Sequence, residues 1–370
     1  MKALTRAAVG LAAVGALILP LAGSANAAAP TKVDPIVAAA AIAKRYMQPP
    51  TKISQTIPLK VKAPSGKSII FMQSGISGTV LIMNGVEAAA KVLGWKFQSI
   101  NYDRANPADL QKGLLNALAF KPDAVITAGA NPDLYGASVI QAYAEAKVPI
   151  VVGSQCPLIA KVPLFKGSNL CVGEEIQGKA FANWFIADSK GTGKALFQNL
   201  PSIPVLTTFV TAFRTEVAAK CPDCVVDVFE TTLAQIGANQ LIPALVNQLR
   251  SAGTYGYVFL DNAQWGSVAL SNQLEAAGIG NIKVGGRSGD ASALTYLQQG
   301  KQAAWTFQSY EVAGMANVDS VLRILTGSSG IDKNAIPPFQ ILTPANAKSI
   351  SNPYLLPANN LQQYMRIWKR

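Results

Sequence analysis

Side chains that perform acid–base chemistry are scarce in this sequence. It contains no histidine, and its Asp and Glu residues form no cluster that would share a face. It also lacks a Gly-x-Ser-x-Gly nucleophile motif and a glycine-rich phosphate loop. General acid–base catalysis near neutral pH would therefore depend on isolated carboxyl groups. We expect a protein that is not an enzyme and that holds no cofactor and no metal.

The N-terminal residues have the pattern of a signal peptide. Lys2 and Arg6 flank the start of an apolar run over 7–22, and the small residues of 25–27 follow it. Cleavage is expected before Ala28, so 1–27 would be removed. No cysteine lies near this point, so no lipid anchor is predicted. We expect an exported protein of the periplasm or cell envelope.

The chain has four cysteines, at positions 156, 171, 221 and 224. An even number in an oxidising compartment favours disulfides, and the local pairs are Cys156 with Cys171 and Cys221 with Cys224. The Cys-Pro-Asp-Cys segment of the second pair is also compatible with a redox pair or with half of a four-thiolate zinc site.

The formal net charge of +12 is concentrated at the ends of the chain. Residues 28–67 carry a net charge of +6, the last five residues add +3, and 68–360 has only about +1. Nucleic-acid binding requires clustered positive charge on the folded domain, so no nucleic-acid partner is expected. The prolines of 28–67 predict a linker, with a helix possible only over 33–47, and 357–370 is expected to be a basic tail. Both ends are expected to be solvated or to touch an anionic envelope surface.

Short strands alternate with helices from residue 67 onward. The first half has strand patterns at 68–73, 96–102, 124–127 and 149–152, with helical patterns at 79–93, 107–119 and 133–146. Repetition of this kind predicts a parallel sheet covered on both faces. The same alternation begins again after residue 174 and continues to a last helix at 312–325. The predicted fold class is therefore α/β, with two doubly wound parallel-sheet lobes.

Polar residues occupy the predicted ends of these strands. Amides, hydroxyls and glycines dominate at 73–78, 127–131, 153–155, 198–199, 261–262, 287–290 and 308–309. Open parallel sheets bind ligands outside the carboxyl ends of their strands, so two facing lobes would place these residues around one cleft. Such groups are suited to holding a neutral ligand by hydrogen bonds rather than to breaking a bond.

The order of several short segments resembles the type 1 periplasmic solute-binding proteins of the ribose and galactose kind. The segments are Gly-Val-Glu-Ala-Ala-Ala at 85–90, Asn106-Pro107, Lys-Pro-Asp-Ala at 121–124 and Val-Phe-Leu-Asp-Asn at 258–262. The resemblance covers roughly 66–345. It implies two lobes joined by a three-stranded hinge, with crossings near Gly173, Ser309 and Pro338. The implied lobes are 66–173 with 309–338, and 174–308 with 339–356.

The resemblance also implies a role and a partner. Such proteins close on a small molecule and deliver it to an ABC permease, and they are expected to be monomers. The alternative is a sensor that presents its closed form to a membrane receptor. A repressor with this fold would need an N-terminal helix-turn-helix, and the signal peptide occupies that place.

Four positions depart from the pattern of the sugar-binding members. Ser154 and Gln155 stand where an Asp-Arg pair is usual, Phe209 falls near an Arg position, and Ser288 occupies an Asp position. Asn262 and Gln308 match polar contact residues. Charged side chains that form bidentate hydrogen bonds to sugar hydroxyls are thus missing. A partly apolar, neutral ligand is preferred, and a sugar or polyol stays open.

The residues expected to contact ligand combine these positions with their neighbours at the strand ends and with aromatic side chains that offer flat apolar surface. They are Ser74, Ile76, Thr79, Asn131, Ser154, Gln155, Phe209, Asn262, Trp265, Ser288 and Gln308. Trp305 and Phe307 alternate on one strand, so at least one of them must belong to the core. Arg287 could contact ligand or pair with Asp290, and the sequence does not decide between these roles.

Overall fold

The computed structural model describes residues 34–328, 331–333 and 335–370. The predicted signal peptide lies outside the described residues. Residues 35–370 form one unit that contains two sheets. Among the described residues, no helix is both long and apolar enough to cross a membrane.

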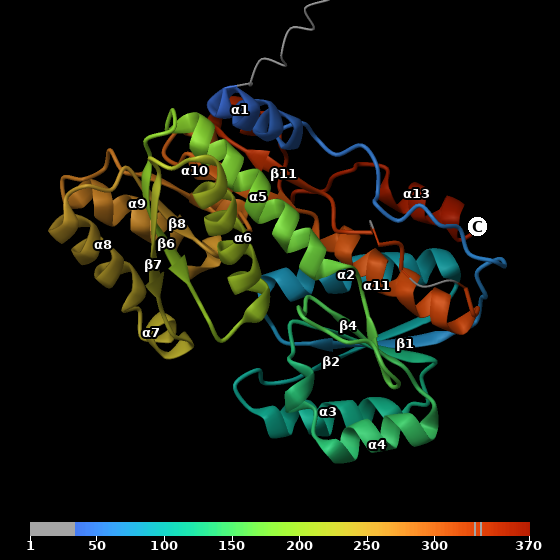
Figure 1. Cartoon of the computed structure of the whole chain (residues 1–370). Helices are drawn as coiled ribbons and strands as arrows, with labels where there is room; N and C mark the ends of the chain where they lie inside the picture. The colour runs from blue at the N-terminus through green and yellow to red at the C-terminus, as the bar shows by residue number, and fades with distance from the viewer. Residues whose placement is uncertain (1–33, 329–330, 334) are drawn as a thin grey trace, which may run out of the picture. The chain divides into compact units, whose positions relative to one another are not determined.

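The first sheet has five parallel strands in the order β2-β1-β3-β4-β5. The strands are β1 (Ser68–Gln73), β2 (Lys96–Asn101), β3 (Ala124–Ala128), β4 (Ile150–Gly153) and β5 (Leu164–Lys166). The helices of this lobe are α2 (Ser77–Leu93), α3 (Pro107–Ala119), η1 (Pro132–Leu134), α4 (Ala137–Ala146) and α11 (Tyr310–Leu325). Figure 1 shows α3 and α4 below this sheet and α2 and α11 above it. We call this part the N-lobe.

The second sheet has six strands in the order β11-β10-β9-β8-β6-β7, and β11 alone is antiparallel to its neighbour. The strands are β6 (Lys194–Asn199), β7 (Val225–Glu230), β8 (Tyr257–Leu260), β9 (Lys283–Gly286), β10 (Ala304–Gln308) and β11 (Phe339–Leu342). One face is covered by α5 (Leu170–Asp188) and α6 (Pro204–Lys220). The opposite face is covered by α8 (Leu241–Ala252), α9 (Ser267–Ala276) and α10 (Ala291–Gln298). The short elements are α7 (Leu233–Gly237), η2 (Ala263–Trp265) and α12 (Pro344–Ala347). We call this part the C-lobe.

The chain passes between the lobes three times. It enters the C-lobe with α5, returns to the N-lobe with α11, and re-enters the C-lobe with β11. Close packing ties α11 to α2, since a Cβ on Gly85 would lie 2.0 Å from the Glu311 carbonyl oxygen. The prediction of a two-lobed α/β fold with parallel sheets is confirmed. The predicted lobe limits stay predictions.

The segment predicted to be a linker packs on both lobes. Helix α1 (Pro35–Tyr46) buries Ala39 and Ala43 against α5, and Tyr46 stacks on Phe339 of β11 at 5.0 Å between ring centroids. Residues 53–63 then contribute Ile53, Leu59 and Ala63 to the core of the N-lobe. The linker prediction is therefore wrong for 35–63. Alanines four residues apart give α1 a smooth face that fits closely against another helix.

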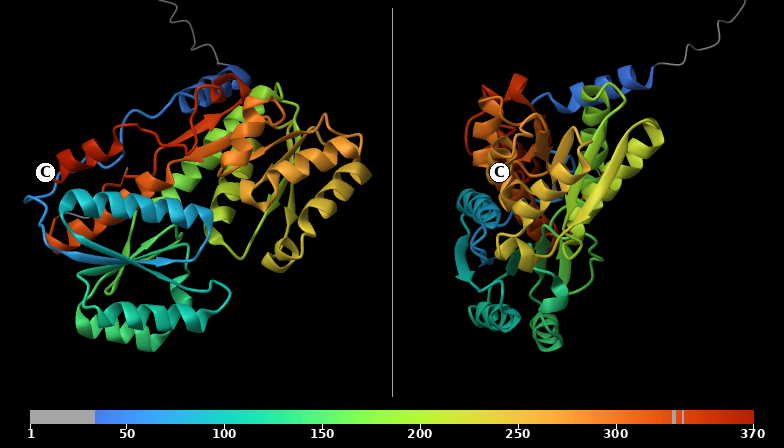
Figure 2. Two further views of the ribbon diagram at one scale, coloured as in Figure 1. Left: turned by 180° about the vertical axis from the view of Figure 1, so that it is seen from behind. Right: turned by 90° about the vertical axis from the view of Figure 1, so that its left-hand side faces the viewer.

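The predicted basic tail is also folded. Helix α13 (Asn360–Ile367) runs beside residues 53–63, as Figures 1 and 2 show from several sides. The Leu59 and Ala63 amides donate to the carbonyls of Ile367 and Trp368 at 2.8 and 3.0 Å. Trp368 is fully buried, and its Nε1 donates to Asp319 Oδ1 at 2.9 Å. We call 53–63 and α13 together the terminal clasp.

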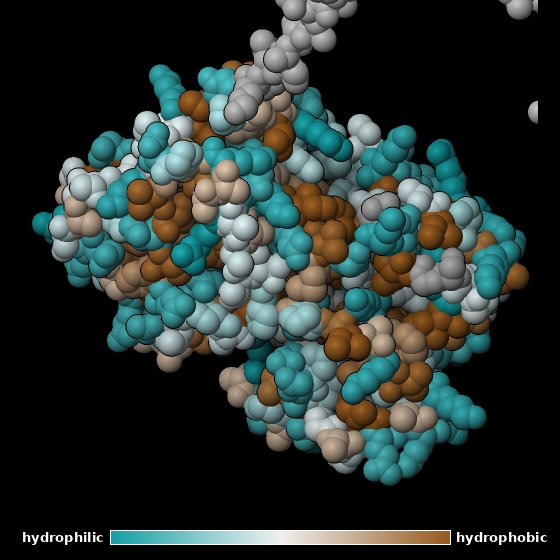
Figure 3. Space-filling model, viewed as in Figure 1, coloured by the Kyte–Doolittle hydropathy of each residue, from teal (hydrophilic) through white to brown (hydrophobic). Residues whose placement is uncertain are grey.

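Apolar residues form the buried cores of both lobes. On the face shown in Figure 3, hydrophilic and hydrophobic residues are interspersed over both lobes. The largest fully buried side chains are aromatic, and Phe181, Phe197 and Phe213 pack together between α5, α6 and the second sheet. The strands are thereby held rigidly, and the residues that follow them are held in place.

Candidate ligand-binding cleft

A cavity of about 130 Å³ lies between the carboxyl ends of the two sheets. Its walls come from both lobes and from the first turns of α2, α5, α6 and α11. We call it the cleft cavity. The lining residues are Ile76, Gly78, Thr79, Ile82, Arg104, Gly129, Ser154, Gln155, Leu170, Ile203, Val205, Leu206, Asn262, Gln264, Trp265, Arg287, Gln308 and Tyr310.

The size of the cleft cavity suits a small molecule. One water molecule needs about 10–15 Å³ of such space, so a cavity of about 130 Å³ is much larger than the space that one water requires. Two larger depressions bear on this assignment: one of about 480 Å³ adjoins the cleft cavity and shares Gln264, Gln308 and Tyr310 with it, and one of about 590 Å³ lies beside Trp184 and Lys283. The latter depression lies at the opposite edge of the second sheet, beside the residues that begin β9 rather than those that follow it. Only the carboxyl ends of a parallel sheet are the usual ligand side.

The N-lobe wall combines glycines and short side chains with the larger side chains of Ile76, Ile82, Gln155 and Tyr310. Thr79 lies in the first turn of α2, shortly after the end of β1. Its hydroxyl donates to Gln73 Oε1 at 2.7 Å. Gly129 and Ser154 follow β3 and β4. Arg104 belongs to the loop after β2 and is exposed. This wall therefore has one charged side chain, at its rim.

The C-lobe wall holds an indole ring in a fixed orientation. Trp265 donates from Nε1 to Asp261 Oδ1 at 2.7 Å, and Asp261 Oδ2 accepts from the Leu200 amide at 2.7 Å. Burial raises the pKa of Asp261 to about 7, although these donors and Gln198 oppose the shift. Asn262 Oδ1 caps η2 by accepting from the Gln264 amide at 3.0 Å.

A buried ion pair supports the same wall. Arg287 Nε and Nη2 donate to the two carboxylate oxygens of Glu174, both at 2.6 Å. Burial alone would lower the pKa of Arg287, but the Glu174 carboxylate more than offsets this, so its pKa lies above its ordinary value. Arg287 therefore pairs with Glu174 rather than with Asp290, and it also lines the cavity, while its contact with ligand stays a prediction. Asp290 instead caps α10 by accepting from the Ala293 amide at 2.8 Å.

Gln308 supplies an acceptor that the protein does not use. Its Oε1 is buried and has no hydrogen-bond partner among the residues that the structure describes. An unpaired buried acceptor costs about 1–3 kcal/mol, so a ligand that donates a hydrogen bond here would recover this cost. Gln308 ends β10, where the chain crosses to α11.

Most residues predicted from the strand ends line the cleft cavity. These are Ile76, Thr79, Ser154, Gln155, Asn262, Trp265 and Gln308. Their role in ligand contact stays a prediction. Because the sheets were identified correctly, the side chains that follow their carboxyl ends converge as expected.

Four predicted contacts are not brought to the cavity. Phe209 is 0% exposed and packs on Phe181 and Phe197 in the C-lobe core. Its helix begins at Pro204, and this register turns Phe209 to the sheet while the first turn faces the cavity. Ser288 is also buried away from the cavity, beside Thr306.

Ser74 and Asn131 are near the cleft, but their side chains contact other residues of the N-lobe rather than the cavity. The Ser74 hydroxyl lies 3.0 Å from Thr79 Oγ1, one layer behind the wall. Asn131 is exposed, and its Oδ1 accepts from the Asp133 amide at 3.1 Å to cap η1. Trp305 and Phe307 both belong to the C-lobe core.

Several lining residues were missed by sequence reasoning. Ile203, Val205 and Leu206 precede or begin α6, and a helix starting at the carboxyl end of a strand is the signal that would have found them. Arg104, Gln264 and Tyr310 lie in a loop, a short 3-10 helix and a first helical turn. Leu170 begins α5 beside a hinge crossing, and no local sequence pattern marks it as a cavity residue.

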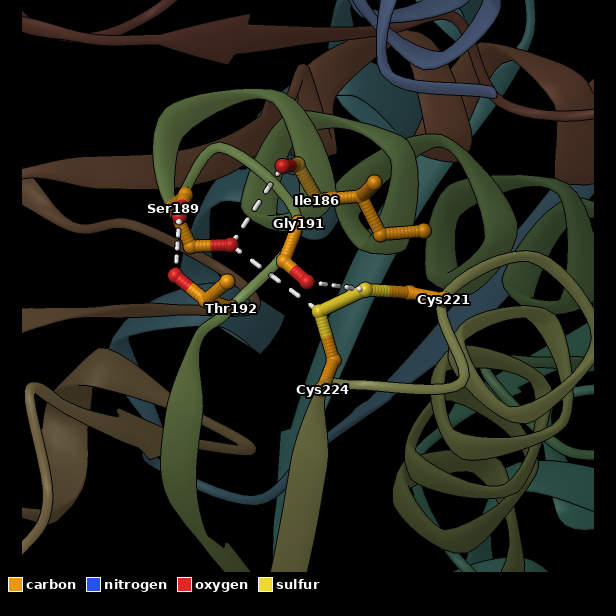
Figure 4. Close-up of a disulfide and its surroundings, with 6 residues drawn as sticks. All are labelled: Ile186, Ser189, Gly191, Thr192, Cys221 and Cys224. Carbon is orange, nitrogen blue, oxygen red and sulfur yellow. Dashed lines mark hydrogen bonds between the residues drawn. A yellow bond between two sulfur atoms is a disulfide. The ribbon is translucent and has the colours of Figure 1, made fainter. Parts of the chain in front are cut away.

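Both predicted disulfides are present, Cys156 with Cys171 and Cys221 with Cys224. Figure 4 shows the second bridge between the end of α6 and the start of β7, beside Gly191 and Ser189. Cys221 Sγ lies 3.2 Å from the Gly191 carbonyl oxygen. The bridged form replaces the zinc alternative, since neither sulfur is a free thiolate.

Comparison with known proteins identifies the family. The model of the periplasmic binding protein domain matches residues 63–329. The chain therefore belongs to this family of solute-binding proteins, and the prediction that it is not an enzyme is confirmed. No curated protein shows a significant match.

Solved structures share the fold at low identity. A solute-binding protein of an ABC transporter from Burkholderia graminis, in complex with D-arabinose, has a TM-score of 0.64 at 16% identity, covering 79% of this chain and all of that one. A periplasmic ribose ABC transporter protein from Conexibacter woesei has a TM-score of 0.63 at 18% identity, covering 78% and 95%. A sugar-binding protein from Bacillus halodurans has a TM-score of 0.63 at 18% identity, covering 78% and 99%.

Proposed function

We propose that this protein captures a small, partly apolar and neutral organic molecule in the cleft cavity and delivers it to an ABC permease. The observation that supports this most strongly is the cavity itself, which combines strand ends of both lobes with an indole ring fixed by Asp261. Closure of the lobes around a ligand is the conformational step that a permease would recognise.

The composition of the wall supports a ligand with an apolar part. Aliphatic side chains come from both lobes, at Ile76, Ile82, Leu170, Ile203, Val205 and Leu206. Trp265 adds an aromatic face. The polar groups are amides, hydroxyls and two arginines, and no carboxylate lines the cavity among the described residues. Since Arg287 is already paired with Glu174, it has little charge to offer a ligand.

A sugar or polyol is the second candidate. It is supported by the solved structures, which are described with arabinose, ribose and other sugars. The Gln308 acceptor would suit a ligand hydroxyl. Against it stands the scarcity of charged side chains free to bind adjacent hydroxyls.

A ligand panel separates these candidates. Purified protein would be screened by thermal shift and then by calorimetry against pentoses, hexoses, polyols and small neutral aromatic or alicyclic alcohols. A ligand present at a hundred times its Kd raises the free energy of unfolding by about 2.7 kcal/mol. Binding by the aromatic or alicyclic group supports the first candidate, and binding by sugars alone supports the second.

The same samples test whether the ligand is left chemically unchanged and which membrane protein is the partner. The bound molecule should be recovered unchanged by mass spectrometry, and conversion to a product would contradict the proposal. Reconstitution of the ligand-loaded protein with an ABC permease should stimulate ATP hydrolysis. Stimulation of a receptor kinase instead would favour a sensory role. Light scattering should report a monomer.

A further inference from the structure

The Cys156–Cys171 disulfide joins two parts of the cleft wall that come from different lobes. Cys156 follows Gln155, in the N-lobe loop after β4. Cys171 follows Leu170, in the first turn of α5, the helix that carries the chain into the C-lobe. Both Gln155 and Leu170 line the cavity, so each half-cystine is bonded directly to a wall residue in the chain.

The bridge is packed on the C-lobe. Cys156 is 3% exposed and shares an apolar cluster with Leu200, Val205 and Leu206. Its Sγ lies 3.7 Å from the Thr208 hydroxyl in α6. An N-lobe loop is thereby held against the helix that follows β6. Ile203 and Trp265 pack against this cluster, and both also line the cavity.

Apart from the disulfide, this loop is held by Leu158, which packs on the N-lobe core, and by the Pro163 carbonyl, which accepts from the Ile150 amide at 2.7 Å. Between the disulfide and β5, Ile159 is 82% exposed and Val162 is 69% exposed. The strand β5 that follows has only three residues. A loop with exposed apolar side chains and few packing contacts is ordered mainly by its covalent ties.

We propose that the Cys156–Cys171 bridge preorganises the ligand cavity. It holds Gln155 and Leu170 in their binding positions and limits how far the loop after β4 moves away from the C-lobe when the lobes separate. Cys156 and Cys171 are positioning residues, since they act through the wall residues beside them. Fixing a loop in its bound conformation removes the ordering cost from the binding step, so the bridge increases ligand affinity. This inference rests on the proposed function of the cleft.

The chain contains a matched control. The Cys221–Cys224 bridge lies within the C-lobe, where it joins the end of α6 to β7 (Figure 4). Neither of its cysteines lines the cleft cavity. Removing it changes the cysteine content equally but leaves both walls in place.

The first experiment compares ligand affinity in two double variants. For the ligand found by the panel, Cys156→Ser with Cys171→Ser should raise Kd about tenfold or more, since the loop must be ordered on binding. Cys221→Ser with Cys224→Ser should leave Kd within about twofold, because its change is remote from the wall. Equal Kd values in the two variants would overturn the inference.

Buried serines can impair folding at Cys156, so an apolar pair gives a second measurement. Cys156→Ala with Cys171→Ala removes the bond without adding hydroxyls to the cluster. It should show the same loss of affinity as the serine pair. Wild-type affinity in a folded alanine pair would contradict the inference.

A measurement without ligand separates this inference from the proposed function. In the unliganded protein, amide hydrogen exchange over 154–163 should be at least about tenfold faster in the 156/171 variants than in wild type. The 221/224 variant should match wild type in this segment. If no ligand of the panel binds wild type, the proposed function fails, while unchanged exchange over 154–163 would refute the inference independently.

Discussion

The two walls of the cleft are built differently. In the C-lobe, Trp265 is held by Asp261 and Arg287 by Glu174, so the larger side chains are positioned by buried partners. The N-lobe wall combines glycines and short side chains with the aliphatic side chains of Ile76 and Ile82 and the exposed Arg104. Rigid side chains with satisfied partners need no reordering when a ligand arrives. We propose that ligand docks first on the C-lobe wall and that the N-lobe then closes over it.

The strongest test of this comparison removes the buried cation of the C-lobe wall. Arg287→Ala leaves the Glu174 carboxylate buried without its partner, which should lower the free energy of unfolding by about 3–5 kcal/mol. Urea unfolding measures the loss. The control is Arg104→Ala in the N-lobe wall, which should change stability by less than about 0.5 kcal/mol because its side chain is exposed. Similar losses in the two variants would show that the walls do not differ in this way.

The next effect concerns the aromatic face. Trp265→Ala should weaken ligand binding by about 2 kcal/mol, or roughly thirtyfold in Kd, because an anchored ring contributes much of a binding surface. Trp265→Phe should restore part of the affinity. Calorimetry would detect both changes. An unaltered Kd in the alanine variant would place the ligand away from the C-lobe wall.

The group that holds this ring should make stability depend on pH. The pKa of Asp261 is raised from its ordinary 3.8 to about 7, so between these values the folded state binds more protons than the unfolded state. Stability supplied by protonated Asp261 is therefore complete below about pH 4 and is lost as pH rises toward 7, by up to about 1.4 kcal/mol per pH unit.

Asp261→Asn should remove this part of the slope. Urea unfolding of wild type and variant across pH 4.5–7.5 gives the difference between the two profiles. Groups other than Asp261 contribute equally to both proteins and cancel. Parallel profiles would mean that Asp261 titrates as an ordinary carboxyl group.

The smallest effect concerns Gln308, at the junction of the two lobes. Gln308→Leu removes an acceptor that has no partner in the described structure, so stability should stay the same or rise slightly. Ligand affinity should fall by about 1 kcal/mol, or roughly fivefold. Thermal unfolding and calorimetry on the same sample measure both quantities. A loss of stability with unchanged affinity would contradict this role.

The fold could be predicted because its signals are local. Alternation of short apolar strands with helices appears within windows of about 30 residues, and the carboxyl ends of the strands follow from it. The terminal clasp could not be predicted, because its contacts join distant parts of the chain. The Ile53 amide, for example, donates to the side-chain oxygen of Gln363, which lies 310 residues further along the chain. Prolines and basic residues suggested solvated ends, yet Leu59, Tyr364 and Trp368 are buried there.

The candidate site was predicted in part for the same reason. Strand-end residues such as Asn262 and Gln308 needed only the correct sheet, whereas Glu174 and Arg287 are 113 residues apart and have no local pattern that links them. Phe209 was misplaced because a shift of one or two residues along a helix decides whether a side chain faces the sheet or the cavity. The disulfides were predicted from cysteine number and spacing, but their relation to the cleft required the structure.

Small-angle scattering of the protein with and without saturating ligand tests most directly whether the two lobes close on a guest. The radius of gyration should decrease when a ligand of the panel is added, because the N-lobe swings onto the C-lobe wall. Trp265→Ala should require more ligand for the same decrease. A radius of gyration that stays constant while calorimetry reports full occupancy would contradict closure around the ligand.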